Sequence, residues 1–151
     1  MVSGWFVPTW DQTTNNRISQ LHSSVQPAAT MFINLADQGG MRLRITEGFR
    51  SFERQDELYA QGRTAPGPIV TNAKGGESYH NFGLAIDVVE MVDGQANWNA
   101  DWPAIGGLGK ALGFEWGGDW FGFKDRPHFQ MTGGRSLEEL RELKAAGEWK
   151  P

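Results

Sequence analysis

The segment 78–90, Ser-Tyr-His-Asn-Phe-Gly-Leu-Ala-Ile-Asp-Val-Val-Glu, places a carboxylate in the middle of an apolar run. Its apolar residues alternate in a way that predicts a strand from residue 84 onward, with Asp87 on one face of it. Gly83 gives the backbone freedom to turn between His80 and this strand. An unpaired carboxylate in such a strand is costly or becomes neutral. Asp87 therefore requires a partner, and a metal ion is one.

A second histidine lies near the other end of the chain, in Asp125-Arg-Pro-His128-Phe-Gln. Two histidines and one carboxylate are the ligand set of many catalytic zinc sites, in which a fourth position remains for water. Zinc lowers the pKa of that water to about 7. Nitrogen and oxygen donors suit zinc in a chain that has no cysteine. We therefore expect His80, Asp87 and His128 to bind Zn²⁺, which requires His128 to come from a neighbouring strand.

Two further residues suit catalysis at such a site. Asp125 lies three residues before His128, and Pro127 stiffens the link between them. A carboxylate that is near the metal but not bound to it can take a proton from water and pass it to a leaving amine. Arg50 lies where a predicted strand leads into a helix, and it could stabilise an oxyanion or bind a substrate carboxylate. These roles fit hydrolysis of a peptide bond.

Length, charge and hydropathy exclude several classes of protein. The 151 residues are enough for one domain, 1–151, in which we see no separate wall-binding module. With a net charge of −4 and no basic run, we expect no binding to nucleic acid. No apolar run reaches the roughly 20 residues that a membrane helix needs. The N-terminus resembles no signal peptide, so we expect the protein to be made in the cytoplasm and to reach any outside target only after release. We also expect it to be a monomer.

Hydrophobic periodicity and turn residues predict the elements. Twenty glycines and seven tryptophans indicate a loop-rich α+β domain. Residues 1–16 are expected to form an extended arm with its aromatic side chains, Trp5, Phe6 and Trp10, against the body, followed by a helical turn at 17–21. Helices are predicted at 27–37, 52–61, 102–112 and 136–146, and strands at 41–46, 84–89, 114–116 and 128–131. In the first of these helices, an apolar stripe is expected to face inward, formed by Ala28, Met31, Phe32 and Leu35.

Three segments have no predicted element. The irregular stretch 62–77 leads directly to Ser78 and His80, which favours a place beside a site. The loop 117–123 is rich in glycine and aromatic residues; with Trp116 and Trp120 it either holds a sugar or peptide face by stacking or simply packs. We expect Arg50, Ser78, Trp116 and Trp120 to contact substrate. Alternating polar residues at 93–101 resemble a calcium loop, but the expected glycine is a tryptophan and the terminal glutamate is missing, so a polar turn is favoured.

The motif Ser78-x-His-x-x-Gly-x-Ala-x-Asp87, followed by Asp125-x-x-His128, resembles the signature of the zinc peptidases that include D-alanyl-D-alanine carboxypeptidases and dipeptidases. Other segments are more similar to one branch, the L-alanyl-D-glutamate peptidases of bacterial cell walls and phage endolysins. These segments are Arg17-Ile-x-x-Leu-His22, Gly48-Phe-Arg-Ser-Phe-x-x-Gln55, Leu58-Tyr-Ala-Gln-Gly-Arg-Thr64, Val70-Thr-Asn-Ala-Lys-Gly-Gly76 and Glu115-Trp-Gly-Gly-Asp-Trp120.

The resemblance implies a small antiparallel sheet with helices packed against it, the fold of the hedgehog and DD-peptidase proteins. It implies the same zinc ligands, Asp125 as the catalytic base, and Arg50 as a contact to substrate or tetrahedral intermediate. Aspartate at the base position favours the endopeptidase branch, because the carboxypeptidases more often have glutamate there. Phe49 departs from the usual tyrosine. The implied activity is zinc-dependent hydrolysis of the L-alanyl-D-glutamate bond in the stem peptide of bacterial peptidoglycan, by a phage or prophage endolysin.

Two other functions remain open at this point. The first is a D-alanyl-D-alanine carboxypeptidase or dipeptidase, which would cut a different bond of the same stem peptide. The second is a non-catalytic, zinc-stabilised wall-binding module, as in the hedgehog-like relatives of this fold. A binding module needs no base, so Asp125 and Arg50 beside the ligand set favour an enzyme.

Overall fold

The computed structural model describes residues 7–151, whose α-helices pack mainly against one side of a small sheet. The fold is α+β, as predicted. All five α-helices of the described residues begin at a side-chain cap or have a proline in the first turn, which satisfies or removes free backbone N–H groups there. The helices are α1 Gln12–Ser19, α2 Gln26–Gln38, α3 Phe52–Ala60, α4 Trp102–Ala111 and α5 Leu137–Ala145.

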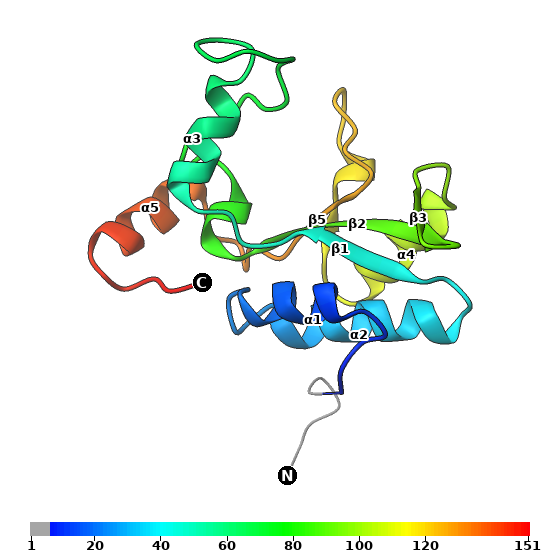
Figure 1. Cartoon of the computed structure of the whole chain (residues 1–151). Coiled ribbons are helices and arrows are strands. Elements are labelled where there is room, and N and C mark those ends of the chain that lie inside the picture. The colour runs from blue at the N-terminus through cyan, green and yellow to red at the C-terminus, as the bar shows by residue number, and fades with distance from the viewer. Residues whose placement is uncertain (1–6) are drawn as a thin grey trace.

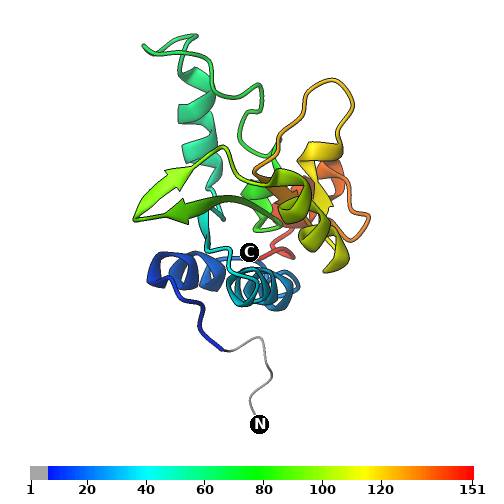
Figure 2. The ribbon, with the colours of Figure 1, turned by 90° about the vertical axis from the view of Figure 1, so that its right-hand side faces the viewer.

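Strand β2, Ala85–Val92, is the central and longest strand of the antiparallel sheet. It pairs on one side with β1, Leu43–Glu47, and on the other with β5, His128–Gln130, beyond which lies β4, Glu115–Trp116. The short strand β3, Gln95–Asn97, returns along β2 as a hairpin that projects from the body of the sheet (Figure 2). The predicted strands are therefore confirmed. The segment expected to be a polar turn contains this additional hairpin strand.

The core lies between the sheet and helices α1, α2 and α4, and Figure 1 shows α1 and α2 together beneath β1 and β2. The aromatic ring of Phe129 on β5 contacts Phe32 of α2, with ring centroids 4.9 Å apart. Gly109 lets α4 approach closely, since a Cβ atom there would lie 2.5 Å from the Phe129 ring. The opposite side of the sheet is not covered by α1 and α2, and there α3 and the loop that follows it rise above the sheet in Figure 1.

The N-terminal arm is shorter than expected, because α1 already begins at Gln12. Asp11 starts this helix by accepting a hydrogen bond from the backbone N–H of Thr14 at 3.2 Å, and the sequence reading overlooked this cap. Trp10 does lie against the body, where its indole N–H donates to the carbonyl oxygen of Leu43 at 3.0 Å. Trp5 and Phe6 lie outside the described residues.

Helix α2 forms where predicted, but its expected inner face is only partly correct: Phe32 is buried and Ala28 packs against the core, whereas the other two residues are not covered. Met31 and Leu35 are exposed, whereas the buried residues are Ala29, Thr30, Phe32, Ile33 and Ala36. Both stripes of this helix are apolar, so periodicity alone did not separate them. The position of the sheet decides which one is covered.

The C-terminal segment returns to the centre of the fold. After α5, the ring of Trp149 stacks on His22 with centroids 4.2 Å apart, and its indole N–H donates to the carbonyl oxygen of Phe82 at 2.9 Å. No helix among residues 7–151 is long and apolar enough to cross a bilayer.

Candidate active site

Three side chains meet above the sheet: His80 and Asp87 from the segment 78–90, and His128 from a distant part of the chain. Oδ1 of Asp87 lies 3.5 Å from Nε2 of His80 and 3.4 Å from Nδ1 of His128. One possible ligand atom from each residue lies within 4.8 Å of the other two. The structure thus brings together the residues that the sequence predicted as zinc ligands.

Sheet register and one tight turn produce this convergence. Asp87 on β2 is the direct cross-strand partner of His128 on β5, so their side chains project from the same face. His80 lies in a short 3-10 turn, η2, Tyr79–Phe82, which the Ser78 side chain caps. Gly83 ends the turn at a φ of 71°, and a Cβ atom there would lie 2.7 Å from the backbone nitrogen of His22. Glycine is therefore required for the chain to pass from His80 into β2.

Hydrogen bonds orient both imidazole rings. Nδ1 of His80 lies 2.8 Å from the carbonyl oxygen of Gly48, which can only accept, so Nδ1 carries the proton and Nε2 has the lone pair. Nε2 of His128 lies 2.8 Å from Oε1 of Gln130, which leaves its Nδ1 as the lone-pair nitrogen. Both lone pairs therefore face Asp87. Such outer partners are the usual means of orienting metal-binding histidines.

The donor set fits a zinc ion. Asp87 Oδ1 is buried and has no hydrogen-bond partner among the described residues, although a buried acceptor normally has one. Two ligands about 2.1 Å from a tetrahedral zinc ion lie about 3.4 Å apart, which matches the spacing around Asp87. Burial raises the pKa of the Asp87 carboxyl, but in the metal-free site protonated His128 and His80 together lower it by more, so the carboxylate is ionised with either a proton-bearing imidazole or a metal cation beside it. A divalent cation would satisfy all three acceptors at once.

Asp125 lines the same cleft as the three ligands. Its backbone is fixed by a hydrogen bond from its N–H to the carbonyl oxygen of Gly117, at 2.9 Å. Burial and the negative charge of Asp87 raise the pKa of the Asp125 carboxyl. His128 and His80 have a smaller, opposite effect, so the net pKa is raised. A carboxyl group with a raised pKa is better suited to accept and return a proton near neutral pH.

Arg50 also lines this cleft, and its guanidinium group is held on two sides. Glu47 accepts from Nε at 2.9 Å and from Nη2 at 2.8 Å, while Oε1 of Gln55 accepts from Nη1 at 3.0 Å. The side chain is only 13% exposed. Of its five N–H groups, two remain free for a ligand. This is the geometry of a pre-positioned binding group for a carboxylate or an oxyanion.

The cleft has a volume of about 460 Å³ and an irregular wall from residues 70–79. This confirms the expectation that the loop 62–77 reaches the site. Ser78 and Trp120 line the cleft too, and the Trp120 ring lies 5.1 Å from that of His128. Trp116 does not line it: its ring stacks on Phe129, and its indole N–H donates to the carbonyl oxygen of Arg126 at 2.8 Å. Trp116 packs beneath the aromatic loop and does not contact the cleft.

Sequence reasoning missed the residues that hold this wall together. Gln55 is fully buried and donates to the carbonyl oxygen of Ala73 at 2.8 Å, which ties the loop to Arg50. Asn81 donates to the carbonyl oxygen of Arg50 at 3.0 Å and accepts from the N–H of Gly76. A glutamine five residues after an arginine does not by itself indicate that the two side chains are hydrogen-bonded or that the glutamine holds a loop. Only its burial shows the role.

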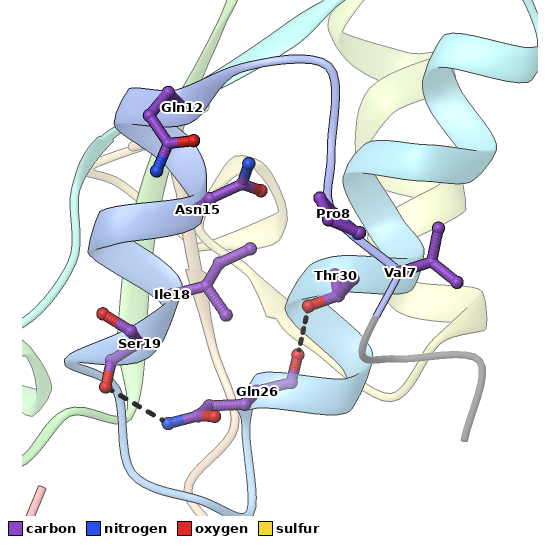
Figure 3. Close-up of a pocket in the computed structure, with 8 residues that line it drawn as sticks. All are labelled: Val7, Pro8, Gln12, Asn15, Ile18, Ser19, Gln26 and Thr30. Atoms are coloured by element: carbon purple, nitrogen blue, oxygen red, sulfur yellow. Dashed lines mark hydrogen bonds between the residues drawn. The ribbon is translucent and has the colours of Figure 1, made fainter. Parts of the chain in front are cut away.

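Another cavity, of about 390 Å³, lies on the helical side of the molecule between α1 and α2 (Figure 3). Its wall includes Val7, Ile18 and Thr30, and one hydrogen bond joins Gln26 to Ser19. No titratable side chain is among its lining residues within the described part of the chain. It therefore offers no chemistry that competes with the His80–Asp87–His128 site.

Comparisons with known proteins agree with this geometry. Residues 71–131 match the model of the D-alanyl-D-alanine carboxypeptidase family. Over 124 residues the chain is 51% identical to the peptidoglycan L-alanyl-D-glutamate endopeptidase CwlK of Bacillus subtilis (strain 168), covering 75% of this chain and 74% of that one. The chain belongs to the L-alanyl-D-glutamate peptidase family.

Other members and relatives of this peptidase family are more distant. The L-alanyl-D-glutamate peptidase of Listeria phage A118 is 31% identical over 119 residues, which cover 76% of this chain but only 39% of the phage protein. The Serratia marcescens L-Ala D-Glu endopeptidase ChiX has a similar structure, with a TM-score of 0.60 and 26% identity over 87% of this chain and 96% of its own. A D,D-pentapeptidase, VanY, solved with Zn(II), shares the fold with a TM-score of 0.58 and 17% identity over 84% of this chain and 79% of its own.

Proposed function

We propose that this protein is a zinc-dependent peptidoglycan endopeptidase that hydrolyses the L-alanyl-D-glutamate bond of the stem peptide. The observation that carries the proposal is the group His80, Asp87 and His128, whose buried acceptors converge beside Asp125 in an open cleft. The 51% identity to CwlK indicates the bond that is cut. The spacing of the donors supports zinc as the cation.

Zinc held by the three ligands would polarise the substrate carbonyl and make water a stronger nucleophile. The remaining roles belong to side chains of the cleft. We assign Asp125 as the base that takes the proton of the attacking water and returns it to the leaving amine. We assign the two free N–H groups of Arg50 to a carboxylate of D-glutamate or to the developing oxyanion. The Ser78 oxygen accepts from the N–H of His80, so its own O–H remains free to donate to substrate.

The experiment is digestion of isolated peptidoglycan by the purified protein, followed by mass spectrometry of the fragments. New amino termini on D-glutamate are expected, with loss of activity on chelation and recovery on addition of zinc. Activity that survives thorough chelation would refute the metal mechanism. The same fragment masses test the rival D-alanyl-D-alanine carboxypeptidase or dipeptidase activity, which the description of the matching family model favours. Release of terminal D-alanine alone would support that rival.

Three further expectations belong to this proposal. The chain is proposed to act as a single catalytic domain, 1–151, and as a monomer, because one copy supplies all the residues assigned to the site. The similarity to the phage A118 enzyme supports an endolysin that acts on the wall after release from the host cytoplasm. Sedimentation of the purified protein tests whether it is a monomer, and lysis of cells only from outside or after membrane damage tests the endolysin role.

A further inference from the structure

A second hollow opens beside the catalytic cleft. It has a volume of about 340 Å³ and is lined by Trp98, Trp102, Lys124, Asp125, Arg126 and Pro127. Asp125 lines both spaces. The two spaces therefore adjoin each other at Asp125. The second one, called here the Trp98 hollow, has no role in the chemistry described above.

The aromatic wall of the Trp98 hollow combines one buried and one exposed tryptophan. Trp102 is 5% exposed and donates its indole N–H to the carbonyl oxygen of Trp98 at 2.9 Å. Trp98 itself is 56% exposed, although it follows a hairpin strand in a polar segment. An indole held by its backbone and left uncovered is a flat apolar surface beside polar groups, which is the combination that binds the apolar face of a sugar ring.

The polar wall supplies hydrogen-bond donors. Lys124 has one hydrogen bond from its ammonium group, to the carbonyl oxygen of Gly118 at 3.3 Å, and two of its N–H groups remain free. Neither Lys124 nor Arg126 forms an ion pair with another described residue. Their free N–H groups suit the neutral oxygens of hydroxyl and N-acetyl groups. The hollow therefore offers stacking together with donors.

In peptidoglycan a sugar lies close to the bond that is cut. The L-alanine of the stem peptide is acylated by the lactyl group of muramic acid. Only that alanine and the lactyl unit, about 7 Å when extended, separate the scissile bond from the sugar ring. Arg50 lies in the other space, where it suits the carboxylates of the D-glutamate side. With the D-glutamate side assigned to Arg50, the Trp98 hollow is the space that remains for the sugar side.

We propose that the Trp98 hollow is a subsite for the muramic acid residue that carries the stem peptide, with the sugar ring against Trp98 and its polar groups on Lys124 and Arg126. This rests on the proposed endopeptidase function. It implies that the enzyme recognises the branch point between glycan and peptide. It also implies a preference for stem peptides that are still attached to sugar.

The test compares two substrates that differ only in the sugar: a muramyl stem peptide and the same peptide with an N-lactoyl cap. The wild-type enzyme is expected to prefer the muramyl peptide in kcat/KM. In Trp98→Ala this preference should fall about tenfold, because truncation of a stacking aromatic anchor has an effect of that size. Trp98→Phe keeps an aromatic face and should restore most of the preference. Phe121→Ala is the matched control, since Phe121 is fully exposed and lines neither hollow.

Direct binding gives an independent readout. Muramyl-L-alanine, the expected amino-terminal product, should shift the indole N–H resonance of Trp98 in a nuclear magnetic resonance titration, and N-lactoyl-L-alanine should not. Equal losses on both substrates in Trp98→Ala would show that the hollow holds peptide, and an unchanged preference would show that it holds nothing; either result overturns the subsite. If the zinc-loaded wild type cleaves neither substrate, the proposed function itself fails.

Discussion

Asp87 shows how one residue determines the chemistry of its surroundings. Its carboxylate oxygen is buried without a partner in the described part of the chain, and two imidazole lone pairs point toward it. Without a cation, three acceptors face each other, which is unfavourable in a site with little water. The residues beyond the ligands, Gly48 and Gln130, determine which imidazole nitrogens take part.

Replacement of Asp125 should separate catalysis from metal binding. In Asp125→Asn the group can no longer accept the proton of water, so kcat is expected to fall by about 10²–10⁴-fold. Zinc content, measured by elemental analysis, and the melting temperature should stay close to wild type, because the assigned ligands are unchanged. A variant that loses zinc would instead identify Asp125 as a ligand.

Gln130 should influence zinc affinity although we assign it no direct contact with the ion. In Gln130→Leu the acceptor for His128 Nε2–H is removed, so the ring is free to take the wrong tautomer or orientation. Competition with a chelator of known affinity should show zinc binding weakened by about 10- to 100-fold. Gln130→Glu keeps the acceptor and is the control. Wild-type affinity in Gln130→Leu would refute this role.

Helix α4 shows how an element can depend on the absence of side chains. Glycine normally weakens a helix interior, yet α4 contains three glycines, Gly106, Gly107 and Gly109. Two of them are buried against rings: a Cβ atom at Gly106 would lie 2.4 Å from Trp116, and one at Gly109 would lie 2.5 Å from Phe129. These glycines lower the intrinsic helix propensity of α4, but they allow the helix to pack closely behind the strand that carries His128.

The two environments in α4 allow a matched stability experiment. Gly109→Ala should lower the free energy of unfolding by about 1–3 kcal/mol, because the new methyl group overlaps a buried ring. Gly107 is exposed, and a Cβ atom there has no neighbour within 4 Å. Gly107→Ala should therefore raise the free energy of unfolding by about 0.5–1 kcal/mol. Urea titration measures both, and equal signs would contradict the packing argument.

At the scale of the whole molecule, contacts between distant segments hold the site on its frame. Trp149 binds the backbone of the turn that carries His80, while the long loop 62–77 is tied to Arg50 through Gln55. On the opposite side, Asp11 joins α1 to the sheet through two hydrogen bonds with Arg44, each of 2.9 Å. These contacts link the C-terminal segment to the turn η2 and helix α1 to strand β1.

The ion pair of Asp11 and Arg44 predicts a pH dependence of stability. Burial raises the pKa of Asp11, but hydrogen bonds from Arg44 and Thr14 and the charge of Arg44 together lower it by a larger amount. The pKa in the folded protein is therefore below that in the unfolded chain. The charge therefore stabilises the fold above about pH 4, and this contribution is lost as the pH falls through the folded pKa. Asp11→Asn keeps a helix cap but removes the charge.

At pH 7, Asp11→Asn should therefore be less stable than wild type by about 1–3 kcal/mol, as is typical of a charged hydrogen bond. Chemical denaturation at several pH values measures this difference, which should shrink below about pH 4. A difference that does not depend on pH would show that the cap, and not the charge, is what the variant loses.

The sequence alone determined the features that depend on neighbours in the chain. The helices capped by Ser51, Asp101 and Ser136 begin as predicted, because a cap is a bond between residues three apart. The strand carrying Asp87 and the identity of the nitrogen and oxygen donors were also evident, since both are properties of short segments. The overlooked Asp11 cap belongs to the same class and was available in the sequence.

Tertiary structure alone decided how those donors meet. His128 lies 41 residues after Asp87, and the register between β2 and β5, not the spacing, brings the two together. The choice of imidazole nitrogen in His80 depends on a carbonyl at Gly48, and the covered face of α2 depends on where the sheet lies. Each of these is a contact between segments far apart in sequence, which local pattern does not encode because many registers and packings satisfy the same periodicity.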